Sequence, residues 1–256
     1  MEYLASISYL NLGLLVIAAL IAGYVDTLVG GGGLITIPAL LAAGLPPVAA
    51  LGTNKLQACA GSGTASATLI LSGRVSLRSV RWPMLMAFFG SLVGATIVQF
   101  VDKQVLEVAI PTVILLILVY FLNAPKPKDL NPRPRLSAKA YRSTAIPAIG
   151  FYDGALGPAT GSFFVLAGVS LRAQEIVEAT MRAKTLNFAT NVAALIVFLS
   201  FGQVAIVLGV VMMFGQFLGA RLGAKALYSI NPNALRWLVV IMCALMLAIW
   251  LAQNVF

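Results

Sequence analysis

The sequence lacks histidine altogether and is poor in charge, since only 10% of its 256 residues are Asp, Glu, Lys or Arg. A soluble domain contains roughly a quarter of such residues, so this deficit argues against a soluble protein. The absence of histidine removes the commonest proton shuttle and metal ligand. The two cysteines, Cys59 and Cys243, lie in separate apolar runs, which gives no basis for a disulfide or zinc framework. We therefore expect neither a cofactor nor a bound metal.

The chain also lacks a polar stretch long enough to form a soluble domain. It contains instead apolar runs of about 20 residues, each long enough to cross the hydrocarbon core of a bilayer. Such runs occur at 10–29, 82–100, 105–122, 204–220 and 235–251. The N-terminus has no basic region and no small-residue cleavage site of a secretory signal, so the first run is expected to be a retained helix. These features predict an all-α, multi-pass integral membrane protein surrounded by the lipid bilayer.

The net charge of +9 does not indicate a nucleic-acid partner. Most of the Lys and Arg residues lie in the loops between apolar runs, where positive charge determines membrane topology. A nucleic-acid-binding protein would place them against phosphates instead. We expect no nucleic acid among the partners.

An internal repeat covers most of the chain. The segment Gly-Tyr-Val-Asp at 23–26 recurs as Gly-Phe-Tyr-Asp at 150–153. Each copy continues with a glycine-rich break, a short apolar stretch and a helix that contains a lysine; the breaks are at 30–33 and 157–161, and the lysines are Lys55 and Lys184. Matching positions stay 125 to 129 residues apart. Low-complexity apolar sequence does not preserve such an order, so we infer a duplication.

The distribution of positive charge predicts that the two copies are inverted in the membrane. The segment 123–142 is rich in Lys, Arg and Pro, so we expect a cytoplasmic connecting loop without helix. The arginine-rich turn at 74–81 is expected on the same side, whereas its counterpart at 200–203 carries no charge. Inverted repeats are a recurring plan of secondary transporters, with the binding site where the repeats meet.

This reasoning divides the chain into a first transmembrane repeat at 1–122, a cytoplasmic linker at 123–142 and a second transmembrane repeat at 143–256. Each repeat should contain about five helical segments, one of them a short discontinuous helix after the glycine-rich break. Both ends of the chain are expected outside the cytoplasm, because neither carries Lys or Arg.

The motifs of both copies resemble the sulfite exporter TauE/SafE family of membrane permeases. In the first copy the resemblance lies in GGGGLITIP at 30–38 and LGTNKLQ at 51–57. In the second copy it lies in GFYDGALGPATGS at 150–162 and in the Lys-Asn segment at 183–191. The resemblance covers nearly the whole chain. It implies a permease of the bacterial inner membrane for sulfite, sulfonates or related organosulfur anions, without fixing the substrate.

Asp26 and Asp153 occupy equivalent places near the end of the first helix of each copy. A carboxylate in hydrocarbon costs about 3 kcal/mol on insertion scales, so each one needs a partner, water or a proton. Three alternatives are open. Each Asp accepts hydrogen bonds from N–H groups of the glycine-rich break, acts as a coupling or gating group, or pairs with a buried lysine.

Each glycine-rich break is followed by a short apolar segment, at 34–43 and 162–170, of about ten residues that spans only ~15 Å as a helix. The N-termini of such half-helices offer free N–H groups and a partial positive charge to an anion. The expected anion contacts are Gly31, Gly32, Gly33, Leu34, Thr160, Gly161 and Ser162. The alternative is that these glycines only allow close helix packing.

Close packing is the role expected of Gly90-x-x-x-Gly94 and Gly215-x-x-x-Gly219. If the breaks bind the anion, Gly32→Val should abolish binding by its bulk and by restricting the backbone. Gly94→Ala, at a packing position, should cost far less.

The lysines of the two copies lie inside otherwise apolar helices. A compact ammonium suits a small oxyanion, so Lys55 and Lys184 are candidate anion ligands or countercharges. Amide side chains that could donate to the same anion are Asn54, Gln57, Asn187 and Asn191. The alternative is that the lysines extend to a membrane interface and have a structural role.

These observations favour a permease for a small anion, and not an enzyme. A cation or metal permease is an alternative, although buried lysines and the lack of His and Met clusters disfavour it. A different class is an intramembrane aspartyl enzyme, in which Asp26 and Asp153 would share a proton. A membrane assembly factor without substrate and a homo-oligomer both remain open.

Overall fold

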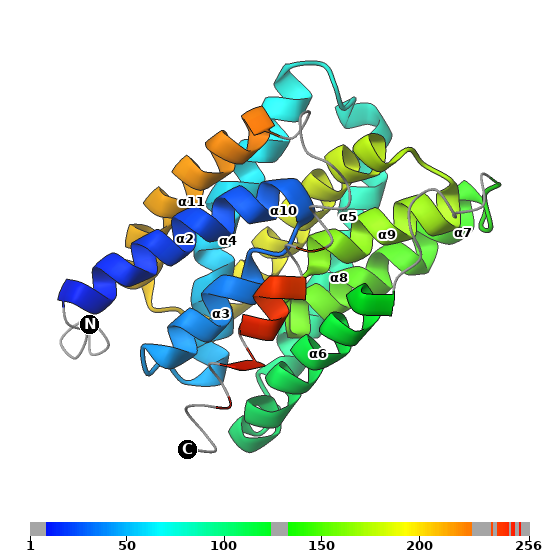
Figure 1. The fold of residues 1–256 in the computed structure, drawn as a ribbon. Helices are drawn as coiled ribbons and strands as arrows, with labels where there is room; N and C mark the ends of the chain where they lie inside the picture. Colours follow the sequence, from blue (N-terminus) through cyan, green and yellow to red (C-terminus); the bar gives the residue numbers. More distant parts are fainter. Residues whose placement is uncertain are drawn as a thin grey trace.

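The computed structural model describes residues 9–123 and 133–226 and, near the C-terminus, residues 237, 240–245, 247, 248 and 251. All regular elements in these residues are helices (Figure 1). In the first half they are α2 (Tyr9–Val29), α3 (Gly33–Ala42), α4 (Pro47–Leu71), α5 (Leu77–Val98) and α6 (Lys103–Asn123). In the second half they are α7 (Ala138–Ser143), α8 (Ala145–Ala155), α9 (Thr160–Arg172), α10 (Ile176–Ser200) and α11 (Ile206–Ala226). The all-α prediction is confirmed.

Five of these helices, α2, α5, α6, α10 and α11, are long and apolar enough to cross a membrane. Four of the five apolar runs in the sequence fall on α2, α5, α6 and α11, while the run at 235–251 is only partly described. Large apolar side chains face outward on these helices: Leu116 of α6 is 62% exposed and Phe214 of α11 is 72% exposed. Such a surface suits contact with lipid and would promote aggregation in water. The chain is a multi-pass membrane protein.

The helix α4 differs from these five. It is 25 residues long but carries a buried polar face with Thr53, Asn54, Lys55 and Gln57. Helix α10 packs against it and carries the matching buried lysine, Lys184. Polar side chains inside a membrane protein are costly and are characteristic of functional positions, so α4 and α10 form the polar centre of the fold.

The helices of the two halves interlock in a repeated pattern. Helix α2 packs along α11, and its counterpart in the second half, α8, packs along α5. Figure 1 shows α2 and α11 side by side, with α4 behind them. Counted from α2 and from its counterpart α8, the first helix of each repeat therefore packs on the fourth helix of the other repeat. This exchange brings the end of each first helix toward the lysine-containing helix of the opposite half.

Glycines allow these helix pairs to approach closely. A Cβ atom on Gly94 would lie 2.0 Å from the carbonyl oxygen of Phe151, and one on Gly219 would lie 1.9 Å from that of Leu20. The predicted packing role of the two Gly-x-x-x-Gly segments is confirmed. The prediction that Gly94→Ala would cost far less than Gly32→Val is wrong on steric grounds, because the added methyl would collide with backbone that cannot move independently.

The linker between the halves contains more structure than the sequence suggested. Residues 124–132 lie outside the described part of the chain. The end of the linker, expected to be free of helix, forms α7, which Ser137 caps by accepting a hydrogen bond from the N–H of Ala140 at 3.1 Å. The prediction of a helix-free linker relied on the charge and proline content of the segment and did not consider Ser137 as a helix cap. Just before α7, the N–H groups of Arg135 and Leu136 both donate to the carbonyl oxygen of Leu171 at the end of α9.

Candidate functional site

Each half contains a helix break where the sequence is rich in glycine. The first break, residues 30–32, separates α2 from α3, and the second break, residues 156–159, separates α8 from α9. Gly30 has φ +82° and Gly157 has φ +90°, a region that glycine enters without strain. Ala159 adopts the same left-handed region with φ +57°, at a cost of about 1 kcal/mol for a residue with a Cβ atom. The two predicted breaks are confirmed.

The first break lies against the start of α9, directly after the second break. A Cβ atom on Gly30 would lie 2.3 Å from the Cα of Gly161, and one on Gly161 would lie 2.4 Å from the Cα of Gly30. The two backbone segments are in direct contact here. Any side chain at either glycine would separate them.

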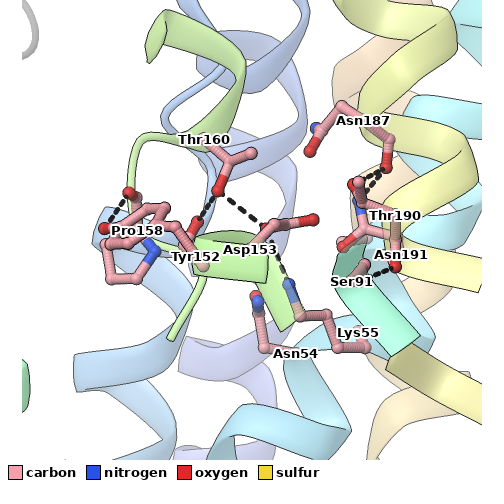
Figure 2. Close-up of polar contacts among 12 residues, drawn as sticks. Asn54, Lys55, Ser91, Tyr152, Asp153, Pro158, Thr160, Asn187, Thr190 and Asn191 are labelled. Carbon is pink, nitrogen blue, oxygen red and sulfur yellow. Dashed lines mark hydrogen bonds and ion pairs between the residues drawn. The ribbon is translucent and has the colours of Figure 1, made fainter. Parts of the chain in front are cut away.

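Lys55 of α4 forms an ion pair with Asp153 of α8, which belongs to the other half. The Lys55 Nζ donates to Asp153 Oδ1 at 2.7 Å, and the side chains are 1% and 2% exposed. The hydroxyl of Thr160 donates to the same oxygen at 2.7 Å (Figure 2). A Cβ atom on Gly157 would lie 2.8 Å from the Lys55 Nζ, so the second break lies against the ion pair. For Asp153, the alternative of a pair with a buried lysine is the one observed.

Lys184 of α10 has a different partner at the equivalent place. Its Nζ donates to the backbone carbonyl oxygen of Asp26, again in the other half. The carboxylate of Asp26 instead accepts a hydrogen bond from the N–H of Gly32 at 3.2 Å, which is the predicted cap on the helix break. Among the described residues no carboxylate forms an ion pair with Lys184, although the side chain is completely buried.

The amides expected beside Lys55 form a small network. Asn54 Oδ1 accepts hydrogen bonds from the hydroxyl of Thr36 at 2.5 Å and from Gln57 Nε2 at 2.8 Å. The Oε1 atom of Gln57 is buried and has no hydrogen-bond partner among the described residues. A Cβ atom on Gly33 would lie 3.6 Å from Asn54 Nδ2. The network therefore connects α4 to the first turns of α3.

The amides expected beside Lys184 are only partly available to a ligand. Asn191 Nδ2 donates to the carbonyl oxygen of Asn187 at 2.8 Å, within α10. The side chain of Asn187 makes no hydrogen bond among the described residues and is 5% exposed. Figure 2 shows the uncommitted oxygen of Asp153 turned toward the side where Asn187 and Asn191 lie. That oxygen, Oδ2, is buried without a partner among the described residues.

Some backbone N–H groups of the two breaks already have a hydrogen-bond acceptor, and others have none. The N–H of Gly32 donates to Asp26, that of Leu34 to the carbonyl oxygen of Gly31 at 2.9 Å, and that of Thr160 to that of Gly157 at 3.4 Å. Within the described part of the chain, the N–H groups of Gly31, Gly33 and Gly161 donate to no acceptor. Ser162, the remaining predicted contact, is buried in the first turn of α9.

Three polar residues of this region were not predicted as part of it. Ser66 donates to the carbonyl oxygen of Lys184 at 2.9 Å, and Ser91 donates to that of Thr190 at 2.7 Å. Gln216 is completely buried on α11, and its amide atoms have no partner among the described residues. Ser91 and Gln216 each follow the first glycine of a Gly-x-x-x-Gly segment. A polar residue inside a packing motif was the signal that could have identified them.

The geometry bears on the two alternative functions. The carboxylates of Asp26 and Asp153 bond to different groups, Gly32 and Lys55, so they do not share a proton as an aspartyl dyad does. The described residues contain no group of three or more His, Cys, Asp or Glu side chains that could hold a metal ion. The site consists of two ammonium groups, two carboxylates, amides and free backbone N–H groups.

Comparison with known proteins places this geometry in a family. The model of the family "Sulfite exporter TauE/SafE" matches residues 15–249. The "Probable membrane transporter protein YfcA" of Escherichia coli (strain K12) is 43% identical over 242 residues, which cover 94% of this chain and 90% of the relative. The "Probable membrane transporter protein ORF9" of Sinorhizobium is 42% identical, with 90% of this chain and 88% of the relative covered.

A "Probable membrane transporter protein" of Haemophilus influenzae is 41% identical, and the match covers 93% of each chain. No solved structure matches the chain. The names of the family and of these relatives describe transporters and not enzymes. The chain belongs to the sulfite exporter TauE/SafE family of membrane transporters.

Proposed function

We propose that this protein is a secondary transporter that moves a small anion across the bacterial inner membrane, and that it binds the anion where the two helix breaks meet, beside Lys184. One observation carries the proposal. The ammonium of Lys184 is completely buried, and among the described residues its hydrogen-bond partner is a neutral carbonyl oxygen. A buried ammonium that forms no direct ion pair is costly, and an anionic substrate would supply one.

Further groups near the breaks suit the same ligand. The free N–H groups of Gly31, Gly33 and Gly161 lie at the N-terminal ends of α3 and α9, where the helix dipole favours an anion. The proposed site adds Gly32, Leu34, Thr160, Ser162, Asn54, Gln57, Asn187 and Asn191. The amides that now bond within their own helix would have to turn toward the ligand.

Lys55 and the two aspartates have a second role in the proposal. Because Lys55 is already paired with Asp153, an anion that approaches Lys55 would compete with that carboxylate. Release or protonation of Asp153 would then couple substrate binding to movement of α8. Asp26 would act at the first break, which its carboxylate holds through the N–H of Gly32.

The family suggests the substrate class and the plan of the fold. Sulfite, a sulfonate or a related organosulfur anion matches the family name and the compact ammonium groups. We also propose that the repeats, 1–122 and 143–256, are inverted about the membrane plane and joined by a cytoplasmic linker at 123–142. The exchanged packing of α2 with α11 and of α8 with α5 supports a two-fold relation between them.

Uptake of labelled sulfite and labelled methanesulfonate into proteoliposomes tests the proposal. Lys184→Gln should lower uptake at least about tenfold, because a hydrogen bond to a charged group is worth roughly 1.5–3 kcal/mol. Lys103→Gln is the matched control, since Lys103 is 65% exposed and belongs to a surface pair with Glu107. Uptake by the Lys184→Gln protein at the parental rate would remove Lys184 from the site.

A further inference from the structure

A second candidate site lies at the end of the helix bundle that carries most of the arginines. A cavity of about 490 Å³ opens there between the starts of α5 and α10, the end of α9, and α7 with the first turn of α8. We name it the arginine pocket. Its lining includes Arg78, Trp82, Tyr141, Arg142, Arg172, Glu178 and Arg182. This volume falls within the range of small-ligand sites.

The arginine pocket has a strong excess of positive charge. Four arginines and one glutamate line it, which gives a net charge of +3. Arg182 is paired with Glu178 at 2.9 Å, and Arg172 donates to the carbonyl oxygen of Leu136. Arg78 and Arg142 form no hydrogen bond or ion pair with the described residues. Arg78 and Arg142, both exposed, therefore line one cavity without an ion-pair partner in this part of the chain.

Two further side chains suit an anion that is held at a membrane surface. Tyr141 lines the pocket, and burial raises the pKa of its hydroxyl to about 12 despite the nearby charges of Arg182 and Arg172. The hydroxyl therefore stays protonated at neutral pH and can donate a hydrogen bond. Trp82 is 51% exposed and lies beside Arg81, whose guanidinium is 5.8 Å from the centre of its ring. Tryptophan at such a position is typical of the boundary between membrane and water.

We propose that the arginine pocket binds a tetrahedral oxyanion group, a phosphate or a sulfonate, at a site separate from the helix breaks. The planar forks of Arg78 and Arg142 each match two oxygens of such a group. Arg172 and Arg182 are held by other partners and add charge around it, while Tyr141 adds a neutral donor. Two sources have this chemistry: the headgroup of an anionic phospholipid, and a soluble oxyanion that collects at the mouth of the transporter.

The fluorescence of Trp82 can measure binding in the arginine pocket. The chain contains three tryptophans, Trp82, Trp237 and Trp250, so replacing the last two by Phe leaves Trp82 as the single reporter. The purified protein in nonionic detergent is titrated with short-chain phosphatidylglycerol, with inorganic phosphate and with short-chain phosphatidylcholine. We expect a saturable change in Trp82 fluorescence with at least one of the two anionic probes and none with phosphatidylcholine. Saturation by phosphatidylglycerol alone identifies a lipid site, and saturation by phosphate identifies a site for soluble oxyanions.

The variant Arg78→Gln/Arg142→Gln should weaken the binding of that probe at least about tenfold, since each arginine offers charge-assisted hydrogen bonds. Arg221→Gln/Lys225→Gln removes the same charge from exposed positions on α11 outside the pocket and should leave the affinity unchanged. Elution of both proteins at the parental volume in size exclusion confirms that they are folded.

The proposal is overturned if neither anionic probe gives saturation, or if both double variants bind equally well. Lys184→Gln should not alter this titration. The outcome is therefore independent of whether Lys184 binds the transported anion.

Discussion

Lys55 and Lys184 occupy equivalent positions of the two halves, yet they bond to different groups. Lys55 meets a carboxylate oxygen of Asp153, whereas Lys184 meets a backbone carbonyl oxygen of Asp26. A buried ion pair costs a great deal to break, because removing one partner leaves the other charge without compensation. Lys55 should therefore contribute more to the stability of the fold than Lys184.

Replacement of Lys55 by Gln should lower the free energy of unfolding by about 3 kcal/mol, since it leaves Asp153 buried and unpaired. Adding Asp153→Asn should restore much of this loss, because two neutral amides can bond to each other. Thermal unfolding in detergent measures both effects, with Lys103→Gln at the exposed pair as the control. If the Lys55→Gln protein is as stable as the parent, the ion pair between Lys55 and Asp153 is not formed.

The sequence predicts which residues are buried and charged in this region, but not how they pair. Asp, Gly and Lys in a repeated order identify Asp26, Asp153, Lys55 and Lys184 as special. Lys55 and Asp153 are 98 positions apart and come from opposite halves. Their pairing depends on how α4 and α8 cross, which no local pattern contains. The hydrogen bond of the Asn191 amide within α10 could not be predicted either, since it depends on the conformation of the side chain.

At the scale of the helices, the glycine-rich breaks could be located from the sequence. The tightness of the helix pairs could not, because Gly-x-x-x-Gly indicates close approach without giving its distance. Gly94 and Gly219 proved to be as intolerant of a side chain as the breaks themselves. The capped helix α7 was hidden by the charge and the prolines around it.

The contact between the breaks gives a prediction at this scale. Gly161→Ala would place its methyl carbon 2.4 Å from the Cα of Gly30, so the first break and α9 must separate. Overpacking of this kind costs typically 1–3 kcal/mol, and we expect sulfite uptake into proteoliposomes to fall at least about tenfold. Gly13→Ala in α2 is the control, because no atom lies within 4 Å of its added carbon. Equal uptake by the two variants would show that the contact is not needed for transport.

For the whole molecule, the family is confirmed, and the relative orientation of the two halves in the membrane is a proposal. The packing of α2 on α11 repeats that of α8 on α5, as expected if a two-fold axis relates the halves. An axis in the membrane plane inverts one half, whereas an axis along the membrane normal leaves both halves in the same orientation. The contact pattern is compatible with either axis. The distribution of positive charge favours the axis in the membrane plane, because the turn that contains Arg74 and Arg78 is basic and its counterpart at 200–203 is not.

Cysteine labelling at equivalent turns of the two halves tests the inversion. Ser72 and Ser200 are exposed and lie at matching turns, and Ser137 is exposed at the end of the linker. In a background with Cys59 and Cys243 replaced by Ser, we expect an impermeant maleimide to label Ser200→Cys on intact cells. Ser72→Cys and Ser137→Cys should react only after the membrane is opened, because positive loops stay in the cytoplasm. Labelling of Ser72→Cys and Ser200→Cys from the same side would establish a parallel repeat. The two breaks would then open toward the same surface, and alternating access by exchange of two inverted halves could not operate.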